Sequence, residues 1–234
     1  MFNLKEKFEF LEDGIDFPFY NNIPKLSGVD WAILVAAVLL FICLVNIHGF
    51  FPKYKFLMYF AVVVIPALYV CKGNYGIFFK KPKLGDIRTI ILCFVLYIIY
   101  AMLVAFLMKT FGDPATGDAV LNGTSKLMLI VSLVVQLWGE EFFKILLLII
   151  VMYLVYRFTE NRTLAIRISI IVTFLIFGLA HMSAYGNILQ VLLIQGLGSI
   201  FDLYAYMKTK NVIISYAVHL LIDIYESMAV LFMS

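Results

Sequence analysis

The chain has 234 residues, of which 64% are apolar and only 14% are charged, and its mean hydropathy is +1.00. This composition excludes an ordinary soluble globular domain and predicts a polytopic protein of the cell membrane. The net charge of +3 does not indicate a nucleic-acid partner, because the basic residues are scattered over short loops. The lipid bilayer is therefore the expected partner of most of the surface.

Apolar runs that are long enough for membrane helices recur along the whole chain. A helix needs roughly 20 residues to cross about 30 Å of hydrocarbon. We expect seven spans, at about Trp31–His48, Phe56–Cys71, Thr89–Leu107, Leu127–Tyr156, Leu164–His181, Ile188–Met207 and Val212–Phe232. The predicted fold class is therefore all-α, a transmembrane helical bundle, with residues 29–234 as a single membrane domain.

Residues 1–28 mix charged residues with phenylalanine. They lack the apolar stretch and the small-residue cleavage site of a signal peptide, so we expect a cytoplasmic N-terminal segment. The three cysteines, Cys43, Cys71 and Cys93, fall in or at the ends of predicted spans without a paired spacing. We interpret them as core residues and not as zinc ligands or disulfide partners.

The basic residues predict how the chain crosses the membrane. With the N-terminus in the cytoplasm, the inner segments hold Lys5, Lys7, Lys25, Lys72, Lys80, Lys81, Lys83, Arg88, Arg157, Arg162, Arg167, Lys208 and Lys210. The outer segments hold Lys53, Lys55, Lys109 and Lys126. Because positive charge favours the cytoplasmic side, we expect the N-terminus inside and the C-terminus outside.

The segment GNYGIFFKKPKLGD, residues 73–86, joins the second and third predicted spans. Its lysines and phenylalanines allow two interpretations. It is either an amphipathic piece in the membrane interface, with lysines at anionic headgroups, or a plain cytoplasmic loop.

Three ionisable residues lie inside the fourth predicted span. The stretch GEEFFK places Glu140, Glu141 and Lys144 between long apolar flanks. An ionised group costs about 2.5 to 3.5 kcal/mol at the centre of a bilayer, so such groups face a protein interior or a water-filled cavity and pair there. Lys144 can reach either glutamate along one helix turn, but it offsets only one of them. The other carboxylate therefore needs a partner on another helix. The structural alternative is a buried ion pair of Glu140 with Lys144.

Two of the three histidines also lie in predicted spans. FGLAH places Phe177 and His181 four residues apart, and HLLID places His219 and Asp223 four residues apart on one helix face. Each histidine alone is typical of a satisfied core residue, but together with Glu140 they indicate a site. His48, at the end of the first span, is expected at the interface.

Residue counting predicts that these side chains meet. Glu140 lies about 17 residues before the polar hairpin YRFTENR and His181 about 19 residues after it, so an antiparallel hairpin brings them to one level. His219 is only about 9 residues past Lys210, roughly 13 Å along a helix. The levels agree if the hairpin projects into the cytoplasm, which predicts a cavity nearer the cytoplasmic face.

Other polar and small residues have simpler interpretations. We expect Gly178, Gly196 and Gly198 at close helix contacts. Asp202 is either a snorkelling residue or a lesser member of the site. Tyr185 and Asn187 are expected in an outer turn, as turn and cap residues.

In this order, the motifs GEEFFK, FGLAH and HLLID resemble those of the CPBP superfamily, the CAAX prenyl endopeptidases and bacteriocin-processing (Abi) proteins. The family pattern is EExxxR, FxxxH and HxxxN or HxxxD. The resemblance covers about residues 139–223 and implies a catalytic core at residues 127–234, formed by the last four helices. One departure is Lys144, which stands one position before the family's arginine; this EExxK form is similar to the PrsW-type proteases.

The resemblance implies an intramembrane endopeptidase that hydrolyses membrane-embedded or membrane-associated peptides or proteins. Carried over by position, Glu140 and His181 would activate water, and His219 with Asp223 would hold the developing oxyanion. The residues that would support them are Glu141, Lys144 and Phe177. A partly desolvated glutamate suits proton abstraction from water, and a histidine donor suits the oxyanion. Asp223 would either fix the tautomer of His219 or, when protonated, donate itself.

Zinc is an alternative within the same site. Glu140, His181 and His219 match the ligand types of hydrolytic zinc with an open fourth position. Some members of the family are described as metalloproteases and others as metal-free glutamate-type enzymes. Because the chain has no HExxH, no local spacing demands zinc, and we expect no obligatory cofactor.

Two other classes of function fit part of the pattern. A proton-coupled transporter or channel also places glutamate, histidine and aspartate inside the membrane, although the sequence shows no inverted repeat or matching pair of interrupted helices. A catalytically silent immunity protein that binds a membrane peptide would keep most of the same residues. Loss of cleavage without loss of binding in Glu140→Gln would separate these classes.

Overall fold

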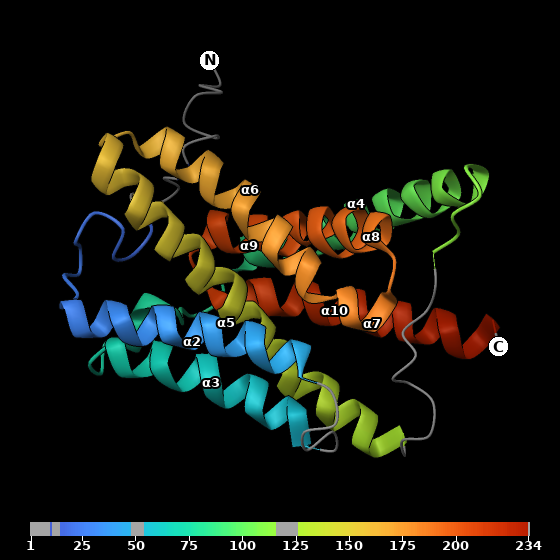
Figure 1. Cartoon of the computed structure of the whole chain (residues 1–234), viewed down its shortest axis with the longest axis horizontal. Coiled ribbons are helices and arrows are strands. Elements are labelled where there is room, and N and C mark those ends of the chain that lie inside the picture. The colour runs from blue at the N-terminus through green and yellow to red at the C-terminus, as the bar shows by residue number, and fades with distance from the viewer. Residues whose placement is uncertain (1–9, 11–14, 48–53, 116–125, 234) are drawn as a thin grey trace.

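A computed structural model describes residue 10 and residues 15–47, 54–115 and 126–233 of the chain. These residues form helices and loops without any β-strand, which confirms the predicted all-α class (Figure 1). His48 lies outside the described residues.

The helices follow the predicted spans closely. In chain order they are α2 (Gly28–Asn46), α3 (Lys55–Val70), η3 (Tyr75–Ile77), α4 (Leu84–Thr110), α5 (Lys126–Thr159), α6 (Arg162–Ala180), α7 (Met182–Tyr185), α8 (Ile188–Gln190), η5 (Val191–Gly196), η6 (Leu197–Ser199), α9 (Ile200–Thr209) and α10 (Val212–Met233). Five helical segments of the described part are long and apolar enough to cross a membrane: Gly28–Asn46, Leu84–Thr110, Ile130–Thr159, Arg162–Tyr185 and Ile188–Thr209. The chain is thus a multi-pass membrane protein, and the total of seven spans stays a prediction.

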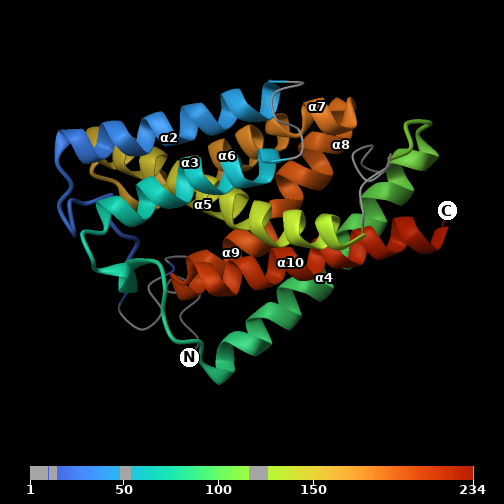
Figure 2. The same ribbon diagram turned by 90° about the horizontal axis from the view of Figure 1, so that it is seen from below.

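Helix α5 is the centre of the bundle. It packs against α3 and α2, against α6, and against α10, and Figure 2 shows it between the α2–α3 pair and the α9–α10 pair. From Phe142 to Ile150 every residue of α5 is buried. A helix that is apolar on all faces is stable only when other helices surround it. This is why charged side chains in α5 meet protein and not lipid.

The sixth predicted span, Ile188–Met207, lies within the candidate membrane span Ile188–Thr209, but this segment is not one regular helix. It consists of α8, the π-helical turn η5, the 3₁₀ turn η6 and α9. Its irregular part is in close backbone contact with α6. A Cβ atom on Gly178 would lie 2.4 Å from the carbonyl oxygen of Val191, and one on Gly196 would lie 2.7 Å from that of Phe174. Only glycine permits this approach, so the predicted close contact is confirmed at both positions.

Gly198 is the third of these glycines. A Cβ atom there would lie 3.0 Å from Cε2 of Tyr97 in α4, so its missing side chain makes room for an aromatic ring. The hydroxyl of Tyr100, one turn further along α4, donates to the carbonyl of Leu193 at 2.7 Å. These contacts fasten α4 to the interrupted segment between α8 and α9.

The N-terminal segment packs on the bundle before α2 begins. Phe17, Phe19 and Tyr20 are each at most 3% exposed. Arg162, at the start of α6, donates to Asp16 with Nη2 2.6 Å from Oδ1. Burial raises the pKa of Asp16, but the hydrogen bonds from Arg162, Tyr20 and the Phe17 backbone and the charge of Arg162 together lower it more, and the net pKa lies below its ordinary value.

The connection between α3 and α4 contains one 3₁₀ turn, η3, and no amphipathic helix before α4. Phe78 is fully buried, and its carbonyl accepts from the backbone of Val212 at 2.9 Å. Asn211 donates from Nδ2 to the carbonyl of Lys80 at 2.8 Å. Residues 78–83 are thus a loop tied to the turn between α9 and α10, and residues 84–86 belong to α4; the position of this segment relative to the membrane interface stays a prediction.

Candidate active site

Glu140 lies where α5 comes closest to α3. A Cβ atom on the preceding Gly139 would lie 2.6 Å from the carbonyl carbon and oxygen of Tyr59, so this glycine brings the two helix backbones together. Glu140 is 7% exposed. Gln136, one turn earlier on α5, donates from Nε2 to Glu140 Oε1 at 2.7 Å. The second carboxylate oxygen is then directed at the histidines.

His181 is the C-terminal cap residue of α6. Its Nδ1 lies 2.8 Å from the carbonyl oxygen of Phe177. Because a carbonyl only accepts, Nδ1 must carry the proton in this contact. The other nitrogen, Nε2, lies 3.9 Å from Glu140 Oε2.

His219, on α10, is oriented in the same way by a carboxylate. Its Nδ1 lies 2.7 Å from Glu141 Oε1, so Nδ1 donates to that oxygen. Its Nε2 lies 3.9 Å from Glu140 Oε2 and 3.5 Å from Asp223 Oδ1. Helices α5, α6 and α10 thus bring together the side chains that the sequence singled out. Glu141 holds the Nδ1 tautomer, and not Asp223 as one of the two sequence-based interpretations had it.

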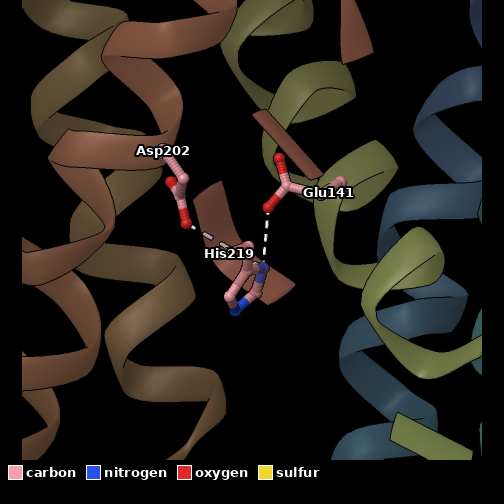
Figure 3. A group of neighbouring side chains, drawn as sticks. All are labelled: Glu141, Asp202 and His219. Atoms are coloured by element: carbon pink, nitrogen blue, oxygen red, sulfur yellow. Dashed lines mark hydrogen bonds and ion pairs between the residues drawn. The ribbon is translucent and has the colours of Figure 1, made fainter. Parts of the chain in front are cut away.

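Behind His219 lies a buried charged cluster, drawn in part in Figure 3. Lys144 Nζ lies 2.6 Å from Glu141 Oε1 and 2.5 Å from Asp202 Oδ2. These three residues are at most 2% exposed, and Ser215 donates to Glu141 Oε2. Lys144 therefore pairs with the second glutamate and with a carboxylate from α9. Asp202 is part of the site and does not snorkel.

Phe177 links the cluster to both histidines. Lys144 Nζ lies 4.7 Å from the centroid of its ring, a cation–π contact. The ring meets His181 edge to face at 4.7 Å and His219 at 6.3 Å between centroids. Phe177 thus supports the site through its ring as well as through its carbonyl.

The site lies near the end of the bundle where α2 ends and α3 begins. Ser183, two residues after His181, donates to the carbonyl of Val45 in the last turn of α2 at 3.4 Å. Gly139 meets Tyr59, which lies in the second turn of α3. The expected cavity nearer the cytoplasmic face depends on the orientation and depth of the bundle in the membrane, and it stays a prediction.

Two groups of side chains invite comparison with a metal site. Among the described residues, donor atoms of Glu141, Asp202 and His219 all lie within 4.8 Å of one another. The ammonium of Lys144 lies among these donors, and it would repel a divalent cation. This cluster is therefore filled by a side-chain cation.

The predicted zinc set, Glu140, His181 and His219, fits zinc by donor type. In each histidine, Nδ1 donates to an acceptor and Nε2 is turned to Glu140. Histidines that bind a metal through one ring nitrogen commonly donate from the other nitrogen in this way. Both Nε2 atoms are 3.9 Å from the carboxylate oxygen. Ligands about 2.0 to 2.2 Å from a tetrahedral zinc lie about 3.3 to 3.6 Å apart, so these side chains would have to move slightly inward.

Several contributors were not predicted. Gln136 and Ser215 each lie four residues before a predicted site residue, Glu140 and His219, and that helical spacing could have indicated them. Glu226 follows His219 by seven residues on the same face of α10 and accepts from the hydroxyl of Tyr97 in α4. No local signal in the sequence connects α4 with α10.

The fold and the site together define a multi-pass helical membrane protein with a buried carboxylate–histidine centre. Residues 122–225 match the family model described as type II CAAX prenyl endopeptidase Rce1-like. This core, which holds every predicted site residue, is thus similar to the Rce1-like family, in agreement with the resemblance to the CPBP superfamily. No curated protein and no solved structure gives a significant match.

Proposed function

We propose that this protein is an intramembrane endopeptidase of the CAAX type that hydrolyses peptide bonds of membrane-associated proteins or peptides. The observation that carries the proposal is the convergence of two oriented histidines on one glutamate. Both Nε2 atoms face Glu140 Oε2 at 3.9 Å. A water molecule fits between groups at this separation with a hydrogen bond of about 2.8 Å to each.

In the proposed reaction, Glu140 takes a proton from that water while the water oxygen attacks the peptide carbonyl carbon. His181 accepts a hydrogen bond at Nε2 and orients the water. The negative charge that develops on the carbonyl oxygen is stabilised by a hydrogen bond from Nε2 of His219. For this donation His219 carries protons on both nitrogens, with Glu141 and Asp223 as its carboxylate neighbours. Glu140 then returns the proton to the leaving amine as the carbon–nitrogen bond breaks.

A zinc-dependent form of the enzyme would hold the ion with Glu140, His181 and His219. When bound there, zinc would polarise the carbonyl and increase the acidity of water. The proposal favours the metal-free reaction, because Lys144 places a positive charge directly behind His219.

The test is cleavage of a helix-destabilised membrane peptide by the purified protein, before and after treatment with a strong chelator. We expect cleavage to survive chelation, and Glu140→Gln to reduce the rate by about 10² to 10⁴. Glu160→Gln, at the exposed turn after α5, is the matched control and should retain the rate.

Chelator-sensitive cleavage that zinc restores would replace the metal-free mechanism and keep the protease. If the folded protein cleaves no membrane peptide, the proposal is wrong, and transport or silent peptide binding takes its place. In that case, peptide binding by the wild-type protein would identify the binding protein.

A further inference from the structure

The charged cluster behind His219 contains one residue to which neither the motifs nor the proposed reaction gives a role. Asp202 lies in the first turn of α9, a favourable place for an acidic side chain because of the helix dipole. It is 2% exposed. Burying a carboxylate is costly unless a specific partner compensates for it, so its presence requires an explanation.

The partner of Asp202 is Lys144. Oδ2 lies 2.5 Å from Nζ, and Oδ1 has no hydrogen-bond partner among the residues that the structure describes. Oδ2 also lies 3.9 Å from Nδ1 of His219 (Figure 3), which is beyond hydrogen-bond distance, so the carboxylate acts on the site through the ammonium. We propose that Asp202 is a positioning residue, which shares Lys144 with Glu141 and thereby leaves Glu141 able to hold His219 in its working orientation. This inference rests on the proposed function.

The geometry at Glu141 shows why the sharing matters. Its Oε1 accepts from both Lys144, at 2.6 Å, and His219, at 2.7 Å. Lys144 Nζ lies only 3.5 Å from His219 Nδ1, so the two donors compete for one oxygen. Asp202 draws the ammonium toward α9. Without its charge, the ammonium would bind Glu141 alone and displace the imidazole.

The arrangement also explains why Lys144 does not donate a hydrogen bond to Nδ1 of His219. If Nδ1 were unprotonated and accepted a hydrogen bond from Lys144, its lone pair would also face the carboxylate of Glu141 at 2.7 Å, which is repulsive. Donation from Nδ1 to Glu141 is compatible with the positions of the four side chains of the cluster, which are Glu141, Lys144, Asp202 and His219. Asp202 and Glu141 together then turn Nε2 of His219 toward Glu140.

The test compares Asp202→Asn with the wild-type chain. Because the substitution acts through the orientation of His219, we expect kcat to fall about 10- to 100-fold, as is typical of residues behind a ligand, with KM within twofold. Asp30→Asn is the matched control. Asp30 is 4% exposed and also pairs with a lysine, Lys72 at 2.9 Å, but it lies outside the site. Its loss should leave kcat unchanged.

A second measurement does not depend on activity. The chain has three histidines, so ¹⁵N-histidine labelling gives a spectrum simple enough to assign. We expect a protonated Nδ1 at His219 in the wild-type protein and an altered His219 signal in Asp202→Asn, with that of His181 unchanged.

An unprotonated Nδ1 in the wild-type protein would overturn the inference even if the variant did not fold. Wild-type kcat and an unaltered His219 signal in Asp202→Asn would also overturn it, while leaving the endopeptidase proposal intact. Absence of cleavage by the wild-type chain would refute the endopeptidase, and the histidine spectra would still decide the role of Asp202.

Discussion

Replacing Gly178 by alanine should damage both the stability and the activity of the protein. The added Cβ would lie 2.4 Å from the carbonyl oxygen of Val191 and 2.9 Å from Cα of Gly196. Ordinary contact begins near 3.4 Å, so α6 and the π-helical turn must separate by about 1 Å. Overpacking of this kind costs about 1 to 3 kcal/mol. Because both obstacles are backbone atoms, we expect the upper part of that range.

His181 follows Gly178 by three residues, so the same displacement reaches the proposed active site. A misplacement of about 1 Å can reduce a reaction rate by about 100-fold. The assays are thermal unfolding of the purified protein in detergent and cleavage of a membrane peptide. Gly85→Ala is the matched control, because no atom lies within 4 Å of its added Cβ. It lies in the first turn of α4 and should unfold at the wild-type temperature or slightly above it. Equal behaviour of the two variants would refute the packing argument.

Three further predictions follow from the charges and contacts of the bundle. A reporter fused after Ser234 should lie outside the cytoplasm and one fused near Arg162 inside, and the opposite pattern would refute the predicted orientation. The pKa of Asp16 is lowered by Arg162, so the stability from this pair should be complete above the unfolded-state pKa, near 4, and be lost as the pH falls through the lower folded-state value. When the free energy of unfolding is measured at decreasing pH, Asp16→Asn should lose less stability than the wild-type protein. The same pH dependence in both proteins would exclude a contribution of the Asp16–Arg162 pair. Tyr97→Phe should lower stability by about 1 to 3 kcal/mol, because it removes the donor to Glu226, and an unchanged unfolding temperature would show that water replaces the hydroxyl.

The fold class and the main site residues were accessible from the sequence because they depend on local patterns. Apolar runs placed six of the seven predicted spans on continuous helices. The motifs around Glu140, His181 and His219 place each side chain on a known helix face. Proximity within one helix is a matter of spacing, so the pairing of Lys144 with a glutamate was also predictable.

What the sequence did not reveal depends on contacts between distant segments. Asp202 reaches Lys144 across 58 positions of the chain, and only the path of the interrupted span brings them together. The same is true of Gly139, whose role is visible only when α3 lies against α5.

The order of the helices along the chain has a consequence for biosynthesis. The site combines Glu140 from α5, His181 from α6 and His219 from α10, and α10 follows all the other described helices. A growing chain that has inserted only α2 to α9 lacks His219, and Glu141 lacks the hydrogen bonds that it accepts from Ser215 and His219 of α10. With the proposed activity, the nascent protein is proteolytically inert while it is handled by the insertion machinery. Cleavage begins only when α10 has entered the membrane and docked, so assembly itself acts as the safeguard against premature proteolysis.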